Sequence, residues 1–83
     1  MKILYFAWVR QKIGKSEETV AKPAGVETLR QLAEFLARRG AGYAEAFADL
    51  SRLRAALNQM HTGLDTPVGP DDEVAFFPPV TGG

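Results

Sequence analysis

The sequence contains no cysteine among its 83 residues. This absence excludes a disulfide, a thiolate metal site and a thiol nucleophile. An excess of charge of either sign is also missing, because ten acidic residues balance ten lysines and arginines. A chain without net charge lacks the electrostatic footprint of nucleic-acid-binding and anionic-membrane-binding proteins, so we expect neither kind of partner. The single histidine, His61, has no companion ligand, and we expect it at a surface or interface rather than in a metal or catalytic site.

Long hydrophobic runs are absent as well. The apolar run near the N-terminus is too short to span a membrane, and no small-residue cleavage site follows it. We therefore expect a cytoplasmic protein. The hydrophobic content of 46% and charged content of 24% are those of a folded globular chain. The length allows one domain, which we place at residues 1–77, followed by a tail at residues 78–83.

Hydrophobic patterning in the first half predicts two strands. Residues 2–9 are rich in Ile, Leu, Val and aromatic side chains, which is typical of a strand that is apolar on both faces. Residues 11–16 break the pattern and are predicted to form a loop. Residues 18–22 are predicted to form a second strand, paired with the first as an antiparallel hairpin.

A helix is predicted next, from five apolar residues at helical spacing: Val26, Leu29, Leu32, Ala33 and Leu36. Two N-terminal caps compete for its start. Gly25 would cap a helix that includes Val26, whereas Thr28 and Gln31 would form a capping box. We favour Gly25, because it brings Val26 onto the apolar stripe. Arg38 and Arg39 suit the last turn of this helix, and Gly40 is a natural stop.

The second half predicts a shorter helix around residues 43–50, a strand within 52–59, a turn-rich segment and a final strand at 73–77. One long helix cannot cover both faces of such a sheet. The predicted fold is therefore α+β: a ubiquitin-like β-grasp, with a mixed sheet of four to five strands and one main helix on one face. In this arrangement the first and last strands lie side by side in parallel.

The tail is stiff, uncharged and narrow. Pro78 cannot donate to a sheet ladder, so the sheet must end near Phe77, and Pro79 extends the stiff segment. The six residues that follow Phe77 reach roughly 20 Å when extended. Gly82 and Gly83 carry no side chain, which lets the backbone enter a narrow channel. A frayed terminus is the common meaning of a terminal Gly-Gly pair. Here the rigid apolar spacer before it favours function.

A terminal carboxylate is ionised at neutral pH and is a poor electrophile. Conversion to an acyl-adenylate would activate it, and displacement of AMP by a persulfide would then yield a thiocarboxylate, a sulfur donor that needs no cysteine. The sequence has no phosphate-cradling glycine-rich loop and no paired nucleophile and base. An enzyme partner must therefore carry out the activation.

The ending Phe-Phe-Pro-Pro-Val-Thr-Gly-Gly at residues 76–83, preceded by Asp-Glu-Val-Ala, resembles the signature of the MoaD family, the small subunits of molybdopterin synthase. The opening residues 2–7 and the triplet at residues 57–59 resemble that family too. The resemblance implies a non-catalytic sulfur carrier for molybdenum cofactor synthesis, with no metal and no bound cofactor of its own.

The resemblance also implies the partners. A MoeB-like enzyme would adenylate Gly83 with ATP, and a sulfurtransferase would convert the adenylate to a thiocarboxylate. The tail would insert into a MoaE-like large subunit, which holds the catalytic groups in an assembly of two copies of each chain. There the sulfur would pass to cyclic pyranopterin monophosphate. The threading segment would be Pro78, Pro79, Val80, Thr81 and Gly82.

Alternation along the last strand predicts the docking surface. Neighbouring strand residues point to opposite faces, so Val74 and Phe76 are assigned to the core, and Ala75 and Phe77 to the face without a helix. The resemblance implies that this second face binds the large subunit, with Leu4 and Phe6 beside Ala75 and Phe77. Arg10 is a further candidate for recognition by a partner.

Three other functions remain open from the sequence. A carrier for thiamine synthesis or for tRNA thiolation would share the fold and the Gly-Gly end. A ubiquitin-like protein modifier would use the same activated terminus on lysines. A plain β-grasp interaction domain would have an inert tail.

Overall fold

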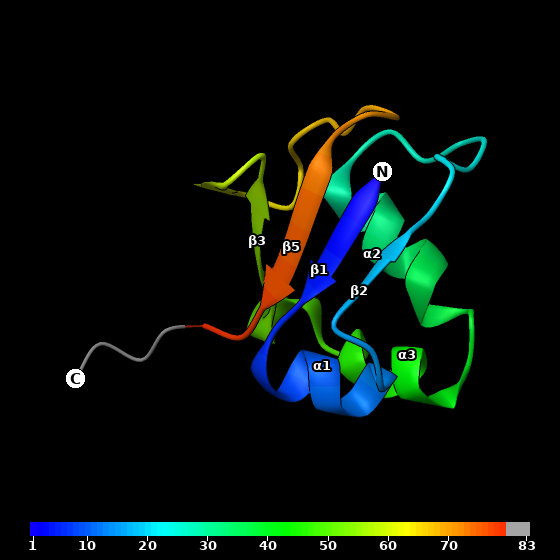
Figure 1. Ribbon diagram of the computed structural model, residues 1–83, viewed down its shortest axis with the longest axis vertical. Helices are drawn as coiled ribbons and strands as arrows, with labels where there is room; N and C mark the ends of the chain where they lie inside the picture. The colour runs from blue at the N-terminus through cyan, green and yellow to red at the C-terminus, as the bar shows by residue number, and fades with distance from the viewer. Residues whose placement is uncertain (80–83) are drawn as a thin grey trace.

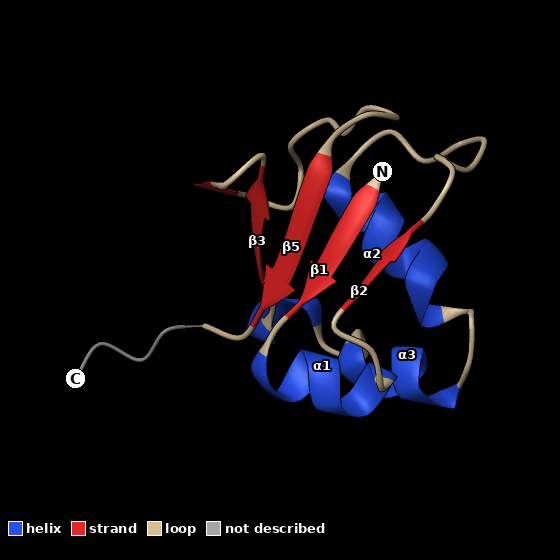
Figure 2. Ribbon diagram, in the orientation of Figure 1, coloured by secondary structure: helices blue, strands red, loops and turns tan. Residues whose placement is uncertain are grey.

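The computed structural model describes residues 1–79, which form a five-stranded mixed sheet with helices against one face and at one end (Figure 1; Figure 2). The strands are β1 (Lys2–Tyr5), β2 (Glu17–Thr19), β3 (Arg54–Leu57), β4 (Met60–Thr62) and β5 (Glu73–Phe77). The helices are α1 (Ala7–Ile13), α2 (Leu29–Ala37), α3 (Ala41–Ala46) and the 3-10 turn η1 (Leu50–Arg52). No helix of this part of the chain is long and apolar enough to cross a membrane.

The strand order is β2-β1-β5-β3-β4. β1 and β5 run parallel at the centre, and the other neighbours are antiparallel. α2 lies against one face, while α1 and α3 lie at the end to which β1 and β5 point (Figure 1). The predicted α+β class, the antiparallel pairing of the first two strands and the parallel contact of the first and last strands are confirmed. The first two strands are not a hairpin, because α1 lies between them, and the second strand is Glu17–Thr19 rather than residues 18–22.

The core lies between α2 and the covered face of the sheet. All five residues of the predicted apolar stripe are buried, and four of them lie in α2: Leu29, Leu32, Ala33 and Leu36. They pack with strand residues that point to the same side, Ile3, Tyr5, Ala55, Val74 and Phe76, and with Leu53, which directly precedes β3. Each large apolar side chain buried here stabilises the fold by about 1.5–3 kcal/mol.

The predicted strand over residues 2–9 is wrong in its second half. β1 ends at Tyr5, and α1 begins at Ala7 and continues into the segment predicted as a loop. The backbone N–H groups of Val9 and Arg10 donate to the carbonyl oxygen of Phe6, which starts the helix. Gly14, at φ 89°, ends it in the left-handed conformation that glycine adopts without strain.

The start of α2 was assigned to the wrong cap. Thr28 accepts from the backbone N–H of Gln31, and the Gln31 side chain accepts from the backbone N–H of Thr28, so the capping box forms. Val26 is buried, but it lies in the segment before the helix. α2 also ends earlier than predicted, at Ala37, and Gly40 is the N-cap of α3.

Strand β4 was not located by the sequence. The strand predicted within 52–59 is shorter, ending at Leu57, and a two-residue turn follows it. Asn58 and Gln59 occupy this turn with φ of 50° and 71°, the left-handed values of a type I′ hairpin. The chain then returns as β4. Asn58 also fixes the start of β5, because its side-chain oxygen accepts from the backbone N–H of Glu73 at 2.9 Å.

Candidate functional site

Strand β5 separates its side chains as predicted. Val74 and Phe76 are fully buried in the core, whereas Ala75 and Phe77 are only partly buried on the opposite face. Leu4 of β1 is partly buried on that same face, and Phe6 is 48% exposed. The predicted faces of Leu4, Ala75 and Phe77 agree with the structure, whereas Phe6 lies just after β1 as the N-cap of α1 and not within the strand. The role of all four residues in binding a partner stays a prediction.

The sheet register aligns one row of side chains across this open face. Leu4 pairs with Ala75 in the parallel contact of β1 and β5. Ala75 pairs with Ala56 of β3, and Ala56 pairs with His61 of β4. Because the register partners of adjacent strands project to the same side of a sheet, Leu4, Ala75, Ala56 and His61 form a continuous row.

A hollow of about 440 Å³ lies over this row. It is lined by eight residues: Leu4, Phe6, Ala56, Gln59, His61, Glu73, Ala75 and Phe77. The two alanines of the row have small side chains, which leave space between the larger neighbours. The predicted docking residues Leu4, Phe6, Ala75 and Phe77 are thus brought together. We call this eight-residue surface the docking hollow.

The sequence did not assign Ala56, Gln59 and Glu73 to this surface, and it left His61 at an unspecified surface or interface position. His61 reaches it because the Asn58–Gln59 turn folds β4 back beside β3. Alternation along β3 could have placed Ala56 opposite the buried pair Leu53 and Ala55. The position of β4 could not be predicted from the sequence without recognising the turn at Asn58 and Gln59.

The docking hollow meets the tail at Phe77. This residue lines the hollow and is the last residue of β5, and Pro78 follows it directly. Pro78 and Pro79 are partly buried. The remaining residues of the predicted threading segment, Val80 to Gly82, and the predicted reactive residue Gly83 lie outside the described residues.

Arg10, the other predicted recognition residue, is exposed on α1 and does not line the docking hollow. The structure therefore does not join it to Leu4, Phe6, Ala75 and Phe77. Its role in recognition stays a prediction about a separate surface.

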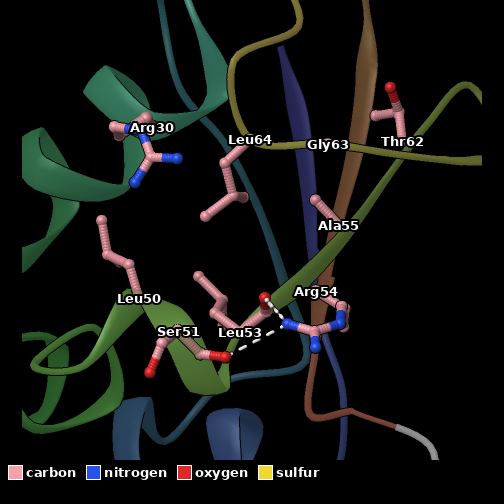
Figure 3. A pocket seen from close by; sticks show the side chains of 9 residues that line it. All are labelled: Arg30, Leu50, Ser51, Leu53, Arg54, Ala55, Thr62, Gly63 and Leu64. Carbon is pink, nitrogen blue, oxygen red and sulfur yellow. Dashed lines mark hydrogen bonds between the residues drawn. The ribbon is translucent and has the colours of Figure 1, made fainter.

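A second hollow lies on the other side of β3, between α2, η1 and the segment after β4 (Figure 3). Two arginines line it, but both guanidinium groups have partners. Arg30 donates to Asp65 at 2.8 Å, and Arg54 donates to the backbone oxygens of Ser51 and Leu53 (Figure 3). These contacts hold both arginines within the fold, and none of the residues that line this hollow lines the docking hollow.

The main electrostatic cluster is centred on Glu18, on the covered side of β2. Its carboxylate accepts from the hydroxyls of Tyr5 and Tyr43, each at 2.7 Å, and from Arg39 at 3.1 Å. Burial alone would raise the pKa of Glu18, but these hydrogen bonds and the charges of Arg39 and Lys15 lower it. Burial and the nearby Glu18 carboxylate raise the pKa of Tyr5. This cluster links β1, β2, α3 and the segment between α2 and α3, and none of its residues lines the docking hollow.

Within residues 1–79 no group of three His, Asp or Glu side chains is placed to hold a metal ion. The docking hollow contains one histidine and one glutamate, together with apolar and amide side chains. Most of its lining is therefore apolar, with the polar side chains of Gln59, His61 and Glu73 among the apolar ones.

Known proteins share both the sequence and the fold. Residues 3–83 match the ThiS family. The chain is 42% identical over its full length to the molybdopterin synthase sulfur carrier subunit of Escherichia coli, covering 99% of that protein. SAMP1 from Haloferax volcanii has the same fold, with a TM-score of 0.72 and 23% identity over 100% of this chain and 98% of that one.

A further structural neighbour belongs to the protein–protein complex of subunits 1 and 2 of molybdopterin-converting factor from Helicobacter pylori. Its TM-score is 0.62, at 23% identity over 99% of this chain and 96% of that one. This likeness supports the β-grasp fold. From the match over residues 3–83 and the full-length identity of 42%, the chain belongs to the ThiS family and, within it, to the MoaD-type sulfur carriers.

Proposed function

We propose that this chain is the sulfur carrier subunit of a molybdopterin synthase and that the carboxylate of Gly83 carries the sulfur. The observation that carries the proposal is the junction at Phe77, where the apolar docking hollow meets the proline segment that leads to Gly83. A partner bound over the hollow would lie beside Phe77, where β5 fixes the start of the tail. The full-length similarity to a curated carrier subunit supports the same role.

Activation requires two covalent steps, both on partner enzymes. On a MoeB-like enzyme, a Gly83 carboxylate oxygen attacks the α-phosphorus of ATP, and pyrophosphate leaves. On the sulfurtransferase side, a protein persulfide attacks the carbonyl carbon of this adenylate, and AMP leaves. A thiol then cleaves the resulting acyl disulfide and is itself oxidised to a disulfide with the former persulfide carrier. The thiocarboxylate remains on Gly83.

Delivery takes place on a MoaE-like large subunit. The thiocarboxylate sulfur forms a bond to a carbon of cyclic pyranopterin monophosphate, and a carbon–oxygen bond at that carbon breaks, its oxygen leaving as water or with the phosphate. Water then cleaves the acyl–sulfur bond, which leaves the sulfur on the pterin and restores the Gly83 carboxylate. A dithiolene holds two sulfur atoms, so two carriers are consumed for each product. The catalytic groups belong to the large subunit, and the carrier supplies sulfur and position. We expect this chemistry in the cytoplasm, in an assembly of two carriers and two large subunits.

The docking hollow is the surface that we assign to the large subunit. Leu4, Phe6, Ala75 and Phe77 would be covered on binding, which removes apolar area from water. The chain of the Helicobacter pylori complex that shares this fold is itself seen in contact with a second subunit. Arg10, exposed on α1, is assigned to recognition outside the hollow.

Reconstitution with purified partners tests this function. The thiocarboxylated carrier is mixed with the large subunit and cyclic pyranopterin monophosphate, and sulfur incorporation into the pterin is followed by mass spectrometry. We expect dithiolene formation with the full chain and none with a chain lacking Gly83. Transfer to a thiazole precursor or to tRNA instead, or attachment to lysine, would replace this proposal with a different pathway.

A further inference from the structure

His61 closes one side of the docking hollow. It is the last member of the row that begins at Leu4, and its ring lies 5.0 Å from the ring of Phe77 between centroids, inclined by 48°. Its side chain is exposed, whereas Ala56, its register partner, is buried. The imidazole and the Phe77 ring therefore form one continuous wall above the two alanines.

A partner that fills the docking hollow over Phe77 also contacts His61, because the two residues line the same hollow with their ring centroids 5.0 Å apart. Covering removes the imidazole from water. Desolvation disfavours the charged form of any ionisable group that gains no partner charge. An imidazolium at this position would therefore oppose docking, whereas a neutral imidazole would add aromatic surface to it.

The charged groups around His61 do not neutralise an imidazolium. β4 packs on β3, whose one charged residue is Arg54, and its guanidinium is held by the backbone oxygens of Ser51 and Leu53. Glu73 of β5 lines the same hollow, but no carboxylate oxygen within residues 1–79 lies within 4.0 Å of the His61 ring nitrogens.

Charged residues farther along the open face and in the loop between β4 and β5 are engaged in ion pairs or hydrogen bonds. Lys2 pairs with Glu17 at 3.5 Å, Asp65 pairs with Arg30, and Asp72 accepts from Asn58. Asp71 is exposed at the turn before β5.

We propose that docking of the large subunit is linked to the protonation of His61: the complex forms with the neutral imidazole, and acidification releases the carrier. This inference rests on the proposed function, because it takes the large subunit as the occupant of the docking hollow. Histidine is the residue type whose charge most readily changes in the physiological range, so the effect falls where cells and assays reach. His61 is thus a specificity residue of the interface, and it takes no part in sulfur chemistry.

The test is the dissociation constant of the full chain for the large subunit, measured by calorimetry between pH 5.5 and pH 8. Wild type is compared with His61→Leu, which keeps an apolar wall without a titratable group, and with Leu4→Ala, which removes apolar contact but keeps His61. The ratio of wild type to His61→Leu cancels the titration of groups on the large subunit.

We expect wild-type affinity to fall about tenfold from pH 8 to pH 5.5 relative to His61→Leu. Leu4→Ala should bind more weakly at every pH and retain the wild-type pH dependence. Equal pH dependence in wild type and His61→Leu, or tighter wild-type binding in acid, would overturn the linkage and leave the carrier function standing. Absence of binding by wild type at every pH would instead overturn the proposed function, and the linkage with it. Circular dichroism of the free variants at pH 5.5 checks that each is folded.

Discussion

Phe76 and Phe77 are adjacent in β5 and serve opposite faces of the sheet. Phe76 is fully buried and its ring packs edge-on against Phe47 at 5.1 Å, whereas Phe77 lines the docking hollow beside His61. Truncation of Phe76 would leave a cavity in the core. We expect Phe76→Ala to lower the free energy of unfolding by about 3–5 kcal/mol, measured by urea denaturation. This loss is a large part of the stability of a small domain.

The matched substitution at the neighbouring residue, Phe77→Ala, should weaken binding of the large subunit rather than destabilise the fold. Phe77→Ala removes apolar surface from the docking hollow, and we expect the large subunit to bind at least about tenfold more weakly, as for a central interface aromatic. Its free energy of unfolding should change by only about 1 kcal/mol, because the ring is outside the core. Unfolding of Phe77→Ala, or unchanged affinity, would contradict the assignment of the two faces.

Glu18 stabilises the fold through its charge. Its side chain is 11% exposed and accepts hydrogen bonds from Tyr5, Tyr43 and Arg39. We expect Glu18→Gln to lower the free energy of unfolding by about 1–3 kcal/mol at pH 7, because an ionised acceptor is replaced by a neutral one. Glu17→Gln is the matched control. Its exposed pair with Lys2 should contribute under about 1 kcal/mol.

The difference in unfolding free energy between wild type and Glu18→Gln should depend on pH in one direction. The pKa of Glu18 is lowered in the folded state, so its contribution is fully present above the unfolded value of about 4.3 and is lost as the pH falls through the folded value. Wild type and Glu18→Gln should therefore converge in stability toward acid pH in thermal melts. A difference that grows on acidification would show that the carboxylate is not stabilised by its neighbours.

Gly42 allows α1 and α3 to approach closely. A Cβ atom at this position would overlap the backbone carbonyl oxygen of Lys12. We expect Gly42→Ala to lower the free energy of unfolding by about 1–3 kcal/mol, since the two helices must move apart. Gly63→Ala is the control, because a Cβ there meets no atom within 4 Å. Equal effects of the two substitutions in urea titrations would argue against the close packing of α1 on α3.

The capping box at the start of α2 contributes separately. Thr28→Ala removes the side-chain oxygen that accepts from the Gln31 backbone N–H at 3.2 Å. We expect a loss of about 1 kcal/mol, with recovery in Thr28→Ser, which keeps the hydroxyl. Thermal melting of the three proteins measures this. Full stability in Thr28→Ala would show that the cap is dispensable.

The alternation of side chains along the last strand gave an accurate prediction. The alternation along β5 predicted which side chains enter the core, Val74 and Phe76, and which lie on the open face, Ala75 and Phe77. It could do so because a strand has a period of two and each face here has a distinct environment. The stripe from Leu29 to Leu36 predicted α2 for the corresponding reason at the helical period. Those two elements were enough to place the tail at the end of a strand beside an apolar face.

Secondary structure was predicted less accurately in continuous apolar segments and at unusual turns. Residues 2–9 are apolar throughout, so their periodicity could not separate a short strand from the first turn of α1. The hairpin before β4 lacks the glycine that usually marks a type I′ turn, and Asn58 and Gln59 adopt left-handed values without it. His61 was therefore not assigned to the docking hollow, although its register in β4 brings it there.

The central claim is that Gly83 is the site at which sulfur is attached. Intact mass spectrometry tests it after incubation of the chain with ATP, the activating enzyme and a persulfide sulfur source. The account predicts a mass increase equal to the replacement of one oxygen by sulfur, located in the C-terminal peptide and abolished by deletion of Gly83. An unmodified C-terminus under conditions in which the activating enzyme converts a known carrier would contradict it.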